Sequence, residues 1–335
     1  MIIGILGAGS WGSALANLLA GNGHDVTVWS IDEKEIEMLN TYREQKDRLP
    51  GVHLNDTIVF TTDLEQTIDG KKMIICAVPS PFIRSTAKKI APYITNEQLI
   101  VNVSKGIEEA TLTPIVEIIE SEIPGVKVAV LSGPSHAEEV GIGIPTTVVA
   151  GARDMDTAKL IQNTFMNDVF RVYTSTDVTG IELGGSVKNV IALAAGITDG
   201  LGFGDNTKAA LITRGIAEIA RLGTKMGASQ ETFYGLTGMG DLIVTCASVH
   251  SRNRKAGYLM GKGYTMQQAM DEVKMVVEGV YSAKAAKSLA EKYDVDMPII
   301  MEVNKVLFED KPAADAVRDL MLRDKKVETP MLPWQ

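Results

Sequence analysis

The sequence predicts an α/β domain followed by an all-helical domain. Up to about residue 175, short runs rich in β-branched residues alternate with segments of helical length. Strands separated by such segments are joined by crossover connections and form a mainly parallel sheet. From about Gly180 onward, the apolar residues recur at helical spacing instead. We therefore expect a sheet domain over residues 1–180 and a helical domain over residues 181–335.

The first domain carries a series of short apolar runs that predict strands. They cover residues 2–6, 26–29, 58–60, 73–78, 99–103, 126–131 and 146–150. Cys76 falls inside one of these runs, so it is expected to be buried. With only two cysteines in the chain, Cys76 and Cys246, free thiols and a reducing cytoplasm are the expected setting.

The second domain shows helical periodicity. Three isoleucines recur three and four residues apart, at Ile212, Ile216 and Ile219. This spacing predicts a helix whose opposite face pairs Arg214 with Glu218 at i,i+4. Residues 265–275 and 282–292 also have the pattern of helices.

Composition excludes several classes of function. The 335 residues are 45% hydrophobic and 22% charged, with a net charge of −9, so a broad basic face for nucleic acid or anionic lipid is not expected. No run reaches the roughly eighteen apolar residues that a membrane span needs, and residues 2–6 are too few for a signal peptide. The sequence predicts a soluble cytoplasmic protein that binds any anion through a local basic cluster.

A glycine fingerprint follows the first strand directly. Gly7, Gly9 and Gly12 form a G-x-G-x-x-G pattern that leads into a helix. The first glycine permits a tight turn and the second lets the backbone approach a pyrophosphate, while the third lets the helix pack on its strand. Asp32 lies twenty residues past Gly12, after the second strand, where a carboxylate can accept hydrogen bonds from the adenosine ribose. The first domain is therefore predicted to be a Rossmann-type dinucleotide-binding domain.

Two loops that follow strands carry candidate polar groups. Lys105 stands beside a glycine at a strand end, where it can meet a phosphate or a carbonyl oxygen, although a solvated lysine is equally expected. In the run 132–139, Ser135 is expected to cap a helix. His136 comes next, and a single histidine in a first helical turn is more often structural or solvated than an acid or base.

The helical domain carries the largest group of candidate polar and charged residues. Lys188 and Asn189 stand together at the expected start of an apolar helix, where the helix dipole and desolvation would both lower the lysine pKa into a range useful for proton transfer. The alternative is a lysine that covers apolar surface with its stem. Residues 251–255 then place arginine, asparagine and lysine together, as a phosphate site requires.

Taken together, these motifs resemble the bacterial NAD(P)-dependent glycerol-3-phosphate dehydrogenases over essentially the whole chain. The matching segments are 7–12, 103–106, 132–137, 188–189, 197–206, 240–242, 251–253 and 276–279. The resemblance implies a Rossmann domain followed by a helical domain of the 6-phosphogluconate-dehydrogenase type. It also implies the reversible reduction of dihydroxyacetone phosphate to sn-glycerol 3-phosphate, for phospholipid synthesis.

The resemblance also implies a role for individual residues. Lys188 would exchange the proton at the substrate oxygen, with Lys105 and Asp241 as its catalytic neighbours. The substrate-binding residues would be Lys105, Gly133, Ser135, Lys188, Asn189, Asp241, Thr245, Ser251, Arg252 and Asn253. The cofactor-binding residues would be Gly7, Gly9, Ser10, Trp11, Gly12, Asp32, Lys105, Ala137, Arg252, Val276 and Glu278. No metal ligand is assigned, and a homo-oligomer such as a dimer is compatible with the family.

The run from Ser30 to Asp32 bears on the choice of cofactor. No positive charge follows the second strand until Lys34, whereas many relatives carry His or Arg there. Asp32 would repel a 2′-phosphate, so NAD(H) is favoured, while NADP(H) stays open because some relatives combine an acid here with NADP use.

Two other functions remain as alternatives. One is a reductase of the same architecture that acts on a 3-hydroxy acid or a ketopantoate-like substrate, against which the Arg252 and Asn253 pair argues. The other is a non-enzymatic NAD(H) sensor, which would need none of Lys105, Lys188 and Asp241.

Overall fold

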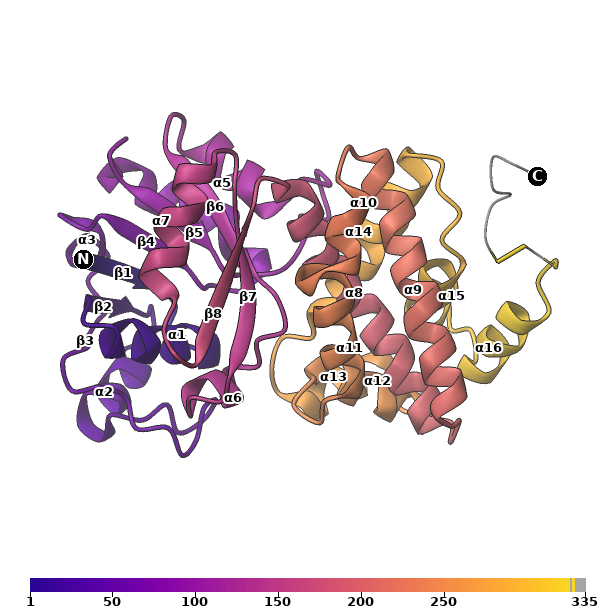
Figure 1. Cartoon of the computed structure of the whole chain (residues 1–335). Helices are drawn as coiled ribbons and strands as arrows, with labels where there is room; N and C mark the ends of the chain where they lie inside the picture. The colour runs from indigo at the N-terminus through magenta and orange to yellow at the C-terminus, as the bar shows by residue number, and fades with distance from the viewer. Residues whose placement is uncertain (326, 329–335) are drawn as a thin grey trace.

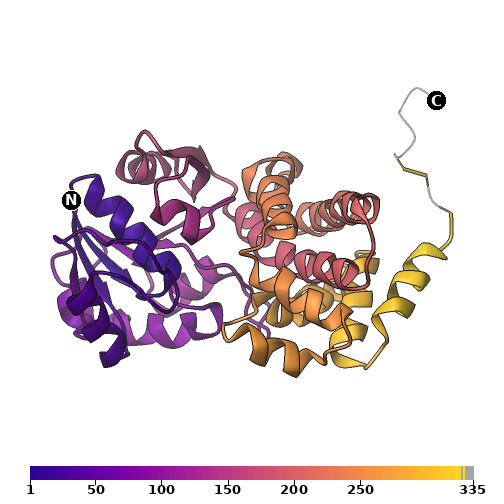
Figure 2. The same ribbon diagram turned by 90° about the horizontal axis from the view of Figure 1, so that it is seen from below.

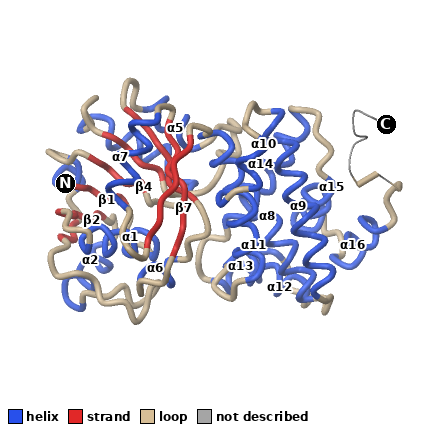
Figure 3. Tube along the Cα trace, in the orientation of Figure 1, coloured by secondary structure: helices blue, strands red, loops and turns tan. Residues whose placement is uncertain are grey.

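The computed structural model describes residues 1–325, 327 and 328, and shows a sheet domain and a helical domain side by side (Figures 1 and 2). All the strands that it describes belong to the sheet domain (Figure 3). The expected order of an α/β domain before a helical one is confirmed. The proposed helical domain runs to residue 335, of which residue 326 and residues 329–335 lie outside the described part.

One sheet organises the first domain, with the strand order β3-β2-β1-β4-β5-β6-β7-β8. The strands are β1 (Ile2–Leu6), β2 (Asp25–Trp29), β3 (Val59–Thr61), β4 (Met73–Cys76), β5 (Leu99–Asn102), β6 (Lys127–Ser132), β7 (Thr146–Ala152) and β8 (Phe170–Ser175). The first seven match the sequence prediction to within two residues at each end. The eighth was not predicted.

The sheet is parallel except at one pair. β6 and β7 run antiparallel, with Leu131 opposite Ala150, while β7 and β8 are parallel to each other. The prediction of a mainly parallel sheet is therefore confirmed, with a reversed pair of strands added at one edge. Strands β1, β4, β5 and β6 keep their carboxyl ends together, which is the edge where open α/β sheets bind ligands.

Helices cover both faces of the sheet. Side chains of α1, α2 and α7 pack on one face, and those of α3, α4 and α5 on the other. The helices are α1 (Ser10–Gly21), α2 (Glu33–Tyr42), α3 (Leu64–Ile68), α4 (Ile83–Ile90), α5 (Ile115–Glu122), α6 (Ala137–Gly141) and α7 (Met155–Phe165), with 3₁₀ turns at Ser80–Phe82 and Ala91–Tyr93. Burial on both faces explains why strands such as β4 are wholly apolar.

Helix α8 (Val178–Gly200) joins the two domains. Val178 and Ile181 belong to the core under the sheet, and the residues from Leu183 to Ile197 belong to the core of the helical domain. This helix is long and apolar enough to span a membrane by length and composition, but its most apolar stretch of 18 residues is wholly buried, as in the core helix of a folded domain.

The remaining helices pack around α8. They are α9 (Asp205–Lys225), α10 (Gln230–Tyr234), the π-helical turn η3 (Leu236–Gly240), α11 (Asp241–Ala247), α12 (Arg252–Gly261), α13 (Met266–Val273), α14 (Glu278–Lys292), α15 (Pro298–Phe308) and α16 (Ala313–Met321). The helices expected at 212–219, 265–275 and 282–292 are confirmed as α9, α13 and α14.

The prediction of an ion pair between Arg214 and Glu218 on α9 was wrong. Glu218 is buried, and its carboxylate accepts hydrogen bonds from the backbone amides of Ile299 and Ile300. It thereby satisfies the free first-turn amides of α15, which a helix cannot satisfy by itself. Arg214 instead pairs with Glu328. Because a helical spacing cannot show which neighbour a face meets, the sequence alone suggested an i,i+4 pair.

Candidate active site

A buried carboxylate joins two lysines from the two domains. Asp241 Oδ1 lies 2.6 Å from the Nζ atom of Lys188, and Asp241 Oδ2 lies 2.6 Å from that of Lys105. Lys188 Nζ also donates to Thr245 Oγ1 at 2.6 Å, and Lys105 Nζ donates to the Gly133 carbonyl at 3.2 Å. Four residues predicted separately for the site are thus brought into one network, together with the backbone of Gly133.

Each member of this network has its place set by a local feature of the chain. Lys105 stands three residues beyond the end of β5, at the carboxyl edge of the sheet. Lys188 lies in the middle of α8, and Asp241 is the first residue of α11, directly after the turn η3. Gly184 lets α8 approach that turn, since a Cβ atom there would lie 2.7 Å from the Thr237 carbonyl oxygen.

Burial controls the charges of the network. It lowers the pKa of Lys188 to about 8, while the charge of Asp241 raises that pKa and the charge of Lys105 lowers it. Burial raises the pKa of Asp241, but the two lysines outweigh it and leave that pKa below its ordinary value. At neutral pH Asp241 is therefore a carboxylate and Lys188 is mostly an ammonium group.

The prediction that the helix dipole lowers the pKa of Lys188 was wrong. Lys188 is the eleventh residue of α8, which starts at Val178, and the dipole acts mainly within the first and last turns. The pKa is lowered by desolvation instead. Sequence reasoning misplaced the start of this helix because glycines 184 and 185 suggested a boundary that the packed structure does not have.

The basic cluster at residues 251–255 divides into groups with different partners. Ser251 caps α12 by accepting from the Arg254 amide, and Arg254 itself is paired with Asp199 at 2.7 Å. Asn253 donates to Asn189 Oδ1 and accepts from the Gly279 amide. Arg252 is partly exposed and makes no hydrogen bond or ion pair with the described residues. Of the two arginines in the cluster, Arg252 is therefore the one available to a phosphate.

Glu278 is joined to this cluster through hydrogen bonds of Asn189. It is the first residue of α14, follows Val276 by two residues, and accepts from Asn189 Nδ2 at 3.4 Å. Burial raises its pKa, while the nearby charges of Arg252, Lys105 and Lys188 lower it. The predicted cofactor residue Glu278 and the predicted substrate residues Asn189 and Asn253 are thus joined by hydrogen bonds.

The turn after β6 differs from the sequence expectation. Ser135 was expected to cap α6, but its hydroxyl donates to the Gly133 carbonyl, and the N-cap residue is His136. Gly133 has φ of +146°, which explains the need for glycine there. Ala137, predicted to touch the cofactor, is the first residue of α6 and is buried. Ser135 therefore stands one residue before the N-cap, and its hydroxyl is used within the turn.

The glycine-rich loop has the shape that a dinucleotide pyrophosphate requires. Gly7 has φ of +113°, and a Cβ atom on Gly12 would lie 1.9 Å from the Gly7 carbonyl oxygen. A Cβ atom on Gly9 would approach only Arg48 Nη1, at 3.8 Å. Gly9 is the N-cap of α1 and offers no side chain to the first-turn amides, which include those of Ser10 and Trp11. These amides can therefore serve an anion, so the loop fits the predicted cofactor.

The loop after β2 is held by hydrogen bonds to the carboxylates of Asp32 and Glu35. Asp32 is exposed and accepts from the amides of Lys34 and Glu35, which caps α2. Glu35 accepts from Ser30, Gln45 and Arg48. Sequence reasoning missed Arg48 and Gln45, which the chain brings back to the glycine-rich loop, where Gln45 also donates to the Ala8 carbonyl. No motif marks these two residues.

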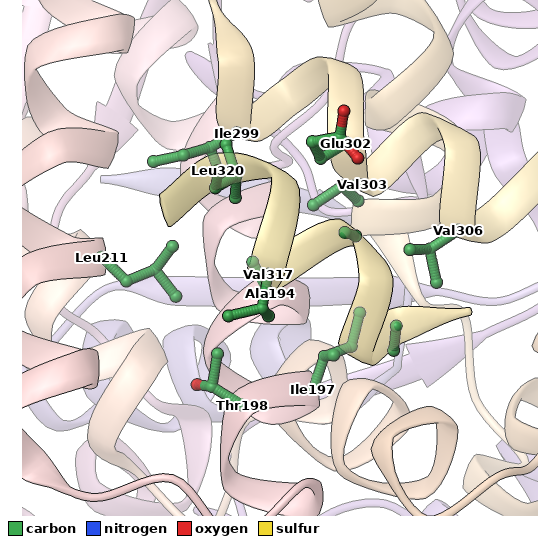
Figure 4. Close-up of a pocket in the computed structure, with 12 residues that line it drawn as sticks. Ala194, Ile197, Thr198, Leu211, Ile299, Glu302, Val303, Val306, Val317 and Leu320 are labelled. Atoms are coloured by element: carbon green, nitrogen blue, oxygen red, sulfur yellow. The ribbon is translucent and has the colours of Figure 1, made fainter. Parts of the chain in front are cut away.

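A separate hollow in the helical domain has no comparable chemistry. It lies among α8, α9, α15 and α16, and Figure 4 shows mainly aliphatic side chains around it. Its charged residue, Glu302, is already paired with Lys305 and Lys311. We therefore place the site at the Lys188 network and not in this hollow. Among the described residues, no cluster of His, Cys, Asp and Glu could hold a metal ion.

Comparison with known proteins shows the family to which the chain is similar. The family model for the NAD-dependent glycerol-3-phosphate dehydrogenase N-terminus matches residues 2–158, and that for the C-terminus matches residues 177–318. The chain is 66% identical to glycerol-3-phosphate dehydrogenase [NAD(P)+] of Agathobacter rectalis, over 99% of both chains. It is 54% identical to the protein of that name from Bacillus subtilis, over 97% of this chain and 95% of that one. The crystal structure of the Coxiella burnetii glycerol-3-phosphate dehydrogenase matches with a TM-score of 0.93 at 36% identity, over 96% of this chain and 99% of that one.

Proposed function

This chain belongs to the NAD-dependent glycerol-3-phosphate dehydrogenase family, and we propose that it reversibly reduces dihydroxyacetone phosphate to sn-glycerol 3-phosphate. The observation that carries the proposal is the buried network in which Asp241 binds both Lys188 and Lys105. A sensor of NAD(H) would gain nothing from bringing together a buried and a partly buried ammonium group, since their desolvation is costly. An oxidoreductase needs such a proton donor where a carbonyl oxygen becomes an alkoxide.

Lys188 acts as the proton donor. An ammonium group has three N–H bonds, and Lys188 uses two of them for Asp241 and Thr245. The third is free to donate to the C2 oxygen of the substrate. The bound nicotinamide cofactor supplies the hydride that reduces the carbonyl carbon. Because burial lowers the pKa of Lys188 to about 8, the proton can be given in reduction and taken back in oxidation near neutral pH.

Lys105 and Asp241 prepare this step. Lys105 also uses two N–H bonds, for Asp241 and the Gly133 carbonyl, which leaves one for the substrate or the cofactor. Asp241 fixes both Nζ atoms and raises the pKa of Lys188 against the effect of burial. Without that carboxylate, two ammonium groups would repel each other inside the protein.

Arg252 is proposed to hold the substrate phosphate. Its guanidinium makes no hydrogen bond or ion pair within the described part of the chain, and it can donate two parallel bonds to a phosphate. Ser251 and Asn253 flank it, and Gly133, Ser135 and Asn189 complete the proposed substrate pocket. This phosphate site argues against a carboxylate substrate such as ketopantoate.

The proposed cofactor site uses the glycine-rich loop, with the pyrophosphate on the amides of Ser10 and Trp11. Lys105, Ala137, Arg252, Val276 and Glu278 would line the nicotinamide end. The family uses NAD(P), and we propose that NAD(H) is favoured because Asp32 follows the second strand, where the adenosine ribose is expected to bind.

The direct test is a spectrophotometric assay of the purified protein. We expect oxidation of NADH when dihydroxyacetone phosphate is added, and little when ketopantoate or a 3-oxo acid replaces it at the same concentration. Failure with dihydroxyacetone phosphate under both NADH and NADPH would refute the proposal. In the cell, we propose a cytoplasmic enzyme that supplies the glycerol phosphate of phospholipids. A homo-oligomer such as a dimer is compatible with this proposal.

A further inference from the structure

His136 has no role in the mechanism above, yet it lies at the site. We propose that His136 is a substrate-binding residue whose Nε2 atom makes a hydrogen bond to an oxygen atom of the bound triose phosphate. The inference rests on the proposed function and adds one residue to its substrate pocket.

The position of His136 is fixed by the turn that also binds Lys105. The residue follows β6 and forms the N-cap of α6, with φ of −68° and ψ of 129°. Three residues earlier, the Gly133 carbonyl accepts from Lys105. The same turn approaches the helical domain, since a Cβ atom on Gly240 would lie 3.8 Å from Pro134 Cδ. His136 therefore stands between the two domains, close to the start of α11 that carries Asp241.

The Nε2 atom of His136 is buried and lacks a hydrogen-bond partner. In the described part of the chain only three buried side-chain polar atoms share this property: Gln45 Oε1, Ser132 Oγ and His136 Nε2. Two of the three flank the same turn, whose Gly133 carbonyl binds Lys105. A buried polar atom without a partner is costly, and most such atoms in proteins are satisfied. A ligand that brings an oxygen atom to this turn would remove that cost.

A second histidine shows where the ring of His136 faces. The His250 ring lies 5.9 Å away between centroids, tilted by 55°. His250 belongs to the helical domain and precedes Arg252, the proposed phosphate residue, by two positions. His136 thus contacts the segment that leads to the proposed phosphate residue, and the charges of Lys188 and Lys105 act on its ring. A substrate bound by Lys188 and Arg252 would lie near both of these neighbours of the ring.

The neutral state of the His136 ring fits a role in substrate binding and not in acid catalysis. Burial lowers its pKa to about 4, and the charges of Lys188 and Lys105 lower it as well, while Asp241 raises it. The ring is therefore neutral at pH 7 and can offer one N–H donor without adding a third positive charge next to Lys188. The proton for reduction comes from Lys188, and His136 contributes affinity for the substrate.

Two substitutions separate this role from simple packing. His136→Phe keeps a ring beside His250 but removes the nitrogen, whereas His136→Gln places an amide nitrogen near the position of Nε2. We expect His136→Phe to raise the KM for dihydroxyacetone phosphate about tenfold or more, the effect of one lost hydrogen bond. The KM for NADH should stay within twofold, and His136→Gln should recover at least half of the loss on a logarithmic scale.

A matched control is His53→Phe, because His53 is exposed and lies far along the chain from both lysines. It should leave both KM values unchanged. The proposal is overturned if His136→Phe leaves the KM for dihydroxyacetone phosphate within twofold of the wild type. It is also overturned if His136→Gln is as impaired as His136→Phe, because the ring would then matter only for packing.

An NMR titration gives a reading that does not depend on turnover. The C2–H resonance of His136, assigned by comparison with His136→Gln, should shift when sn-glycerol 3-phosphate is added, and its pKa should rise as the dianion approaches. An unchanged resonance at saturating ligand would overturn the inference. If the wild-type protein fails to reduce dihydroxyacetone phosphate, the proposed function fails instead. The titration still shows whether sn-glycerol 3-phosphate binds next to His136.

Discussion

Asp241 and Asp32 are both carboxylates that accept hydrogen bonds near the predicted site, but they lie in opposite surroundings. Asp241 is only 1% exposed and binds the ammonium groups of Lys105 and Lys188, which come from different domains. Asp32 is exposed and binds two backbone amides of its own helix. The same chemical group therefore couples two domains in one place and caps a single helix in the other.

The difference follows from the dielectric around each charge. A pair of charges at about 4 Å interacts by roughly 1 kcal/mol in water and by several times that in a protein interior. Buried charges are also screened less by salt. We therefore expect large effects on chemistry from the Lys188 network, and smaller effects on cofactor choice from the loop of Asp32.

The largest expected effect comes from removing the proposed proton donor. Lys188→Ala should lower turnover by about 10² to 10⁴, the usual contribution of one general acid, while cofactor binding stays largely intact. Stopped-flow measurement of NADH oxidation, together with fluorescence titration of NADH, checks both statements. Lys262→Ala, an exposed lysine in the same domain, is the control. A Lys188→Ala protein that keeps more than a third of wild-type turnover would exclude Lys188 from the mechanism.

The next effect concerns the substrate phosphate. Arg252→Ala should weaken substrate binding by about 1.5–3 kcal/mol, or roughly 10- to 150-fold in KM, because charge-assisted hydrogen bonds are lost. Arg252→Lys should recover little, since lysine lacks the planar fork. Steady-state kinetics measure both, and Lys255→Ala, an exposed neighbour, serves as the control. Equal reduction of dihydroxyacetone and its phosphate by the wild type would contradict this assignment.

A third prediction compares the two carboxylates directly through the pH dependence of ketone reduction. Lys188 must be protonated to act, so activity should fall as the pH rises above its pKa of about 8. Asp241 raises that pKa, so Asp241→Asn should move the falling limb to lower pH, by about one unit or more. Asp32→Asn should leave the limb in place. A limb that does not move in Asp241→Asn would show that another group controls it.

The smallest effect is expected at the loop after β2. NADH should be preferred over NADPH by about tenfold in kcat/KM, or roughly 1.4 kcal/mol, because Asp32 would repel a 2′-phosphate. Ile31→Arg combined with Asp32→Ser should narrow or reverse the preference. Serine is chosen because it can still cap α2, so the change should not cost helix stability. Equal efficiency of the wild type with both cofactors would show that this loop does not discriminate.

Much of the sheet domain could be predicted because its signals are local. Apolar runs such as Met73–Cys76 mark buried strands whatever their neighbours are. β8 was missed and the reversal at β6 and β7 was not foreseen, because strand direction depends on which edge a later segment joins. Glu218 was misread for the same reason, since its partners Ile299 and Ile300 are about eighty residues away.

The predicted site residues show the same division. Ser251 to Lys255 stood out as one basic cluster, yet Asp199 pairs with Arg254, and Arg252 has no hydrogen bond or ion pair with any residue that the structure describes. No feature of the sequence identifies Asp199 as that partner. The roles assigned to Asp32, Val276 and Glu278 stay predictions for binding measurements.

The sequence by itself determined the glycine-rich loop, because its three glycines act within a few residues of one another. It also determined the order of the two domains, which the change from strand to helical periodicity sets. Only the tertiary structure decided that Asp241 lies between Lys105 and Lys188, which are 136 and 53 residues away along the chain. It also decided that desolvation, and not a helix end, lowers the pKa of Lys188. Burial and long-range contact depend on the whole packed chain, so no local pattern of residues can specify them.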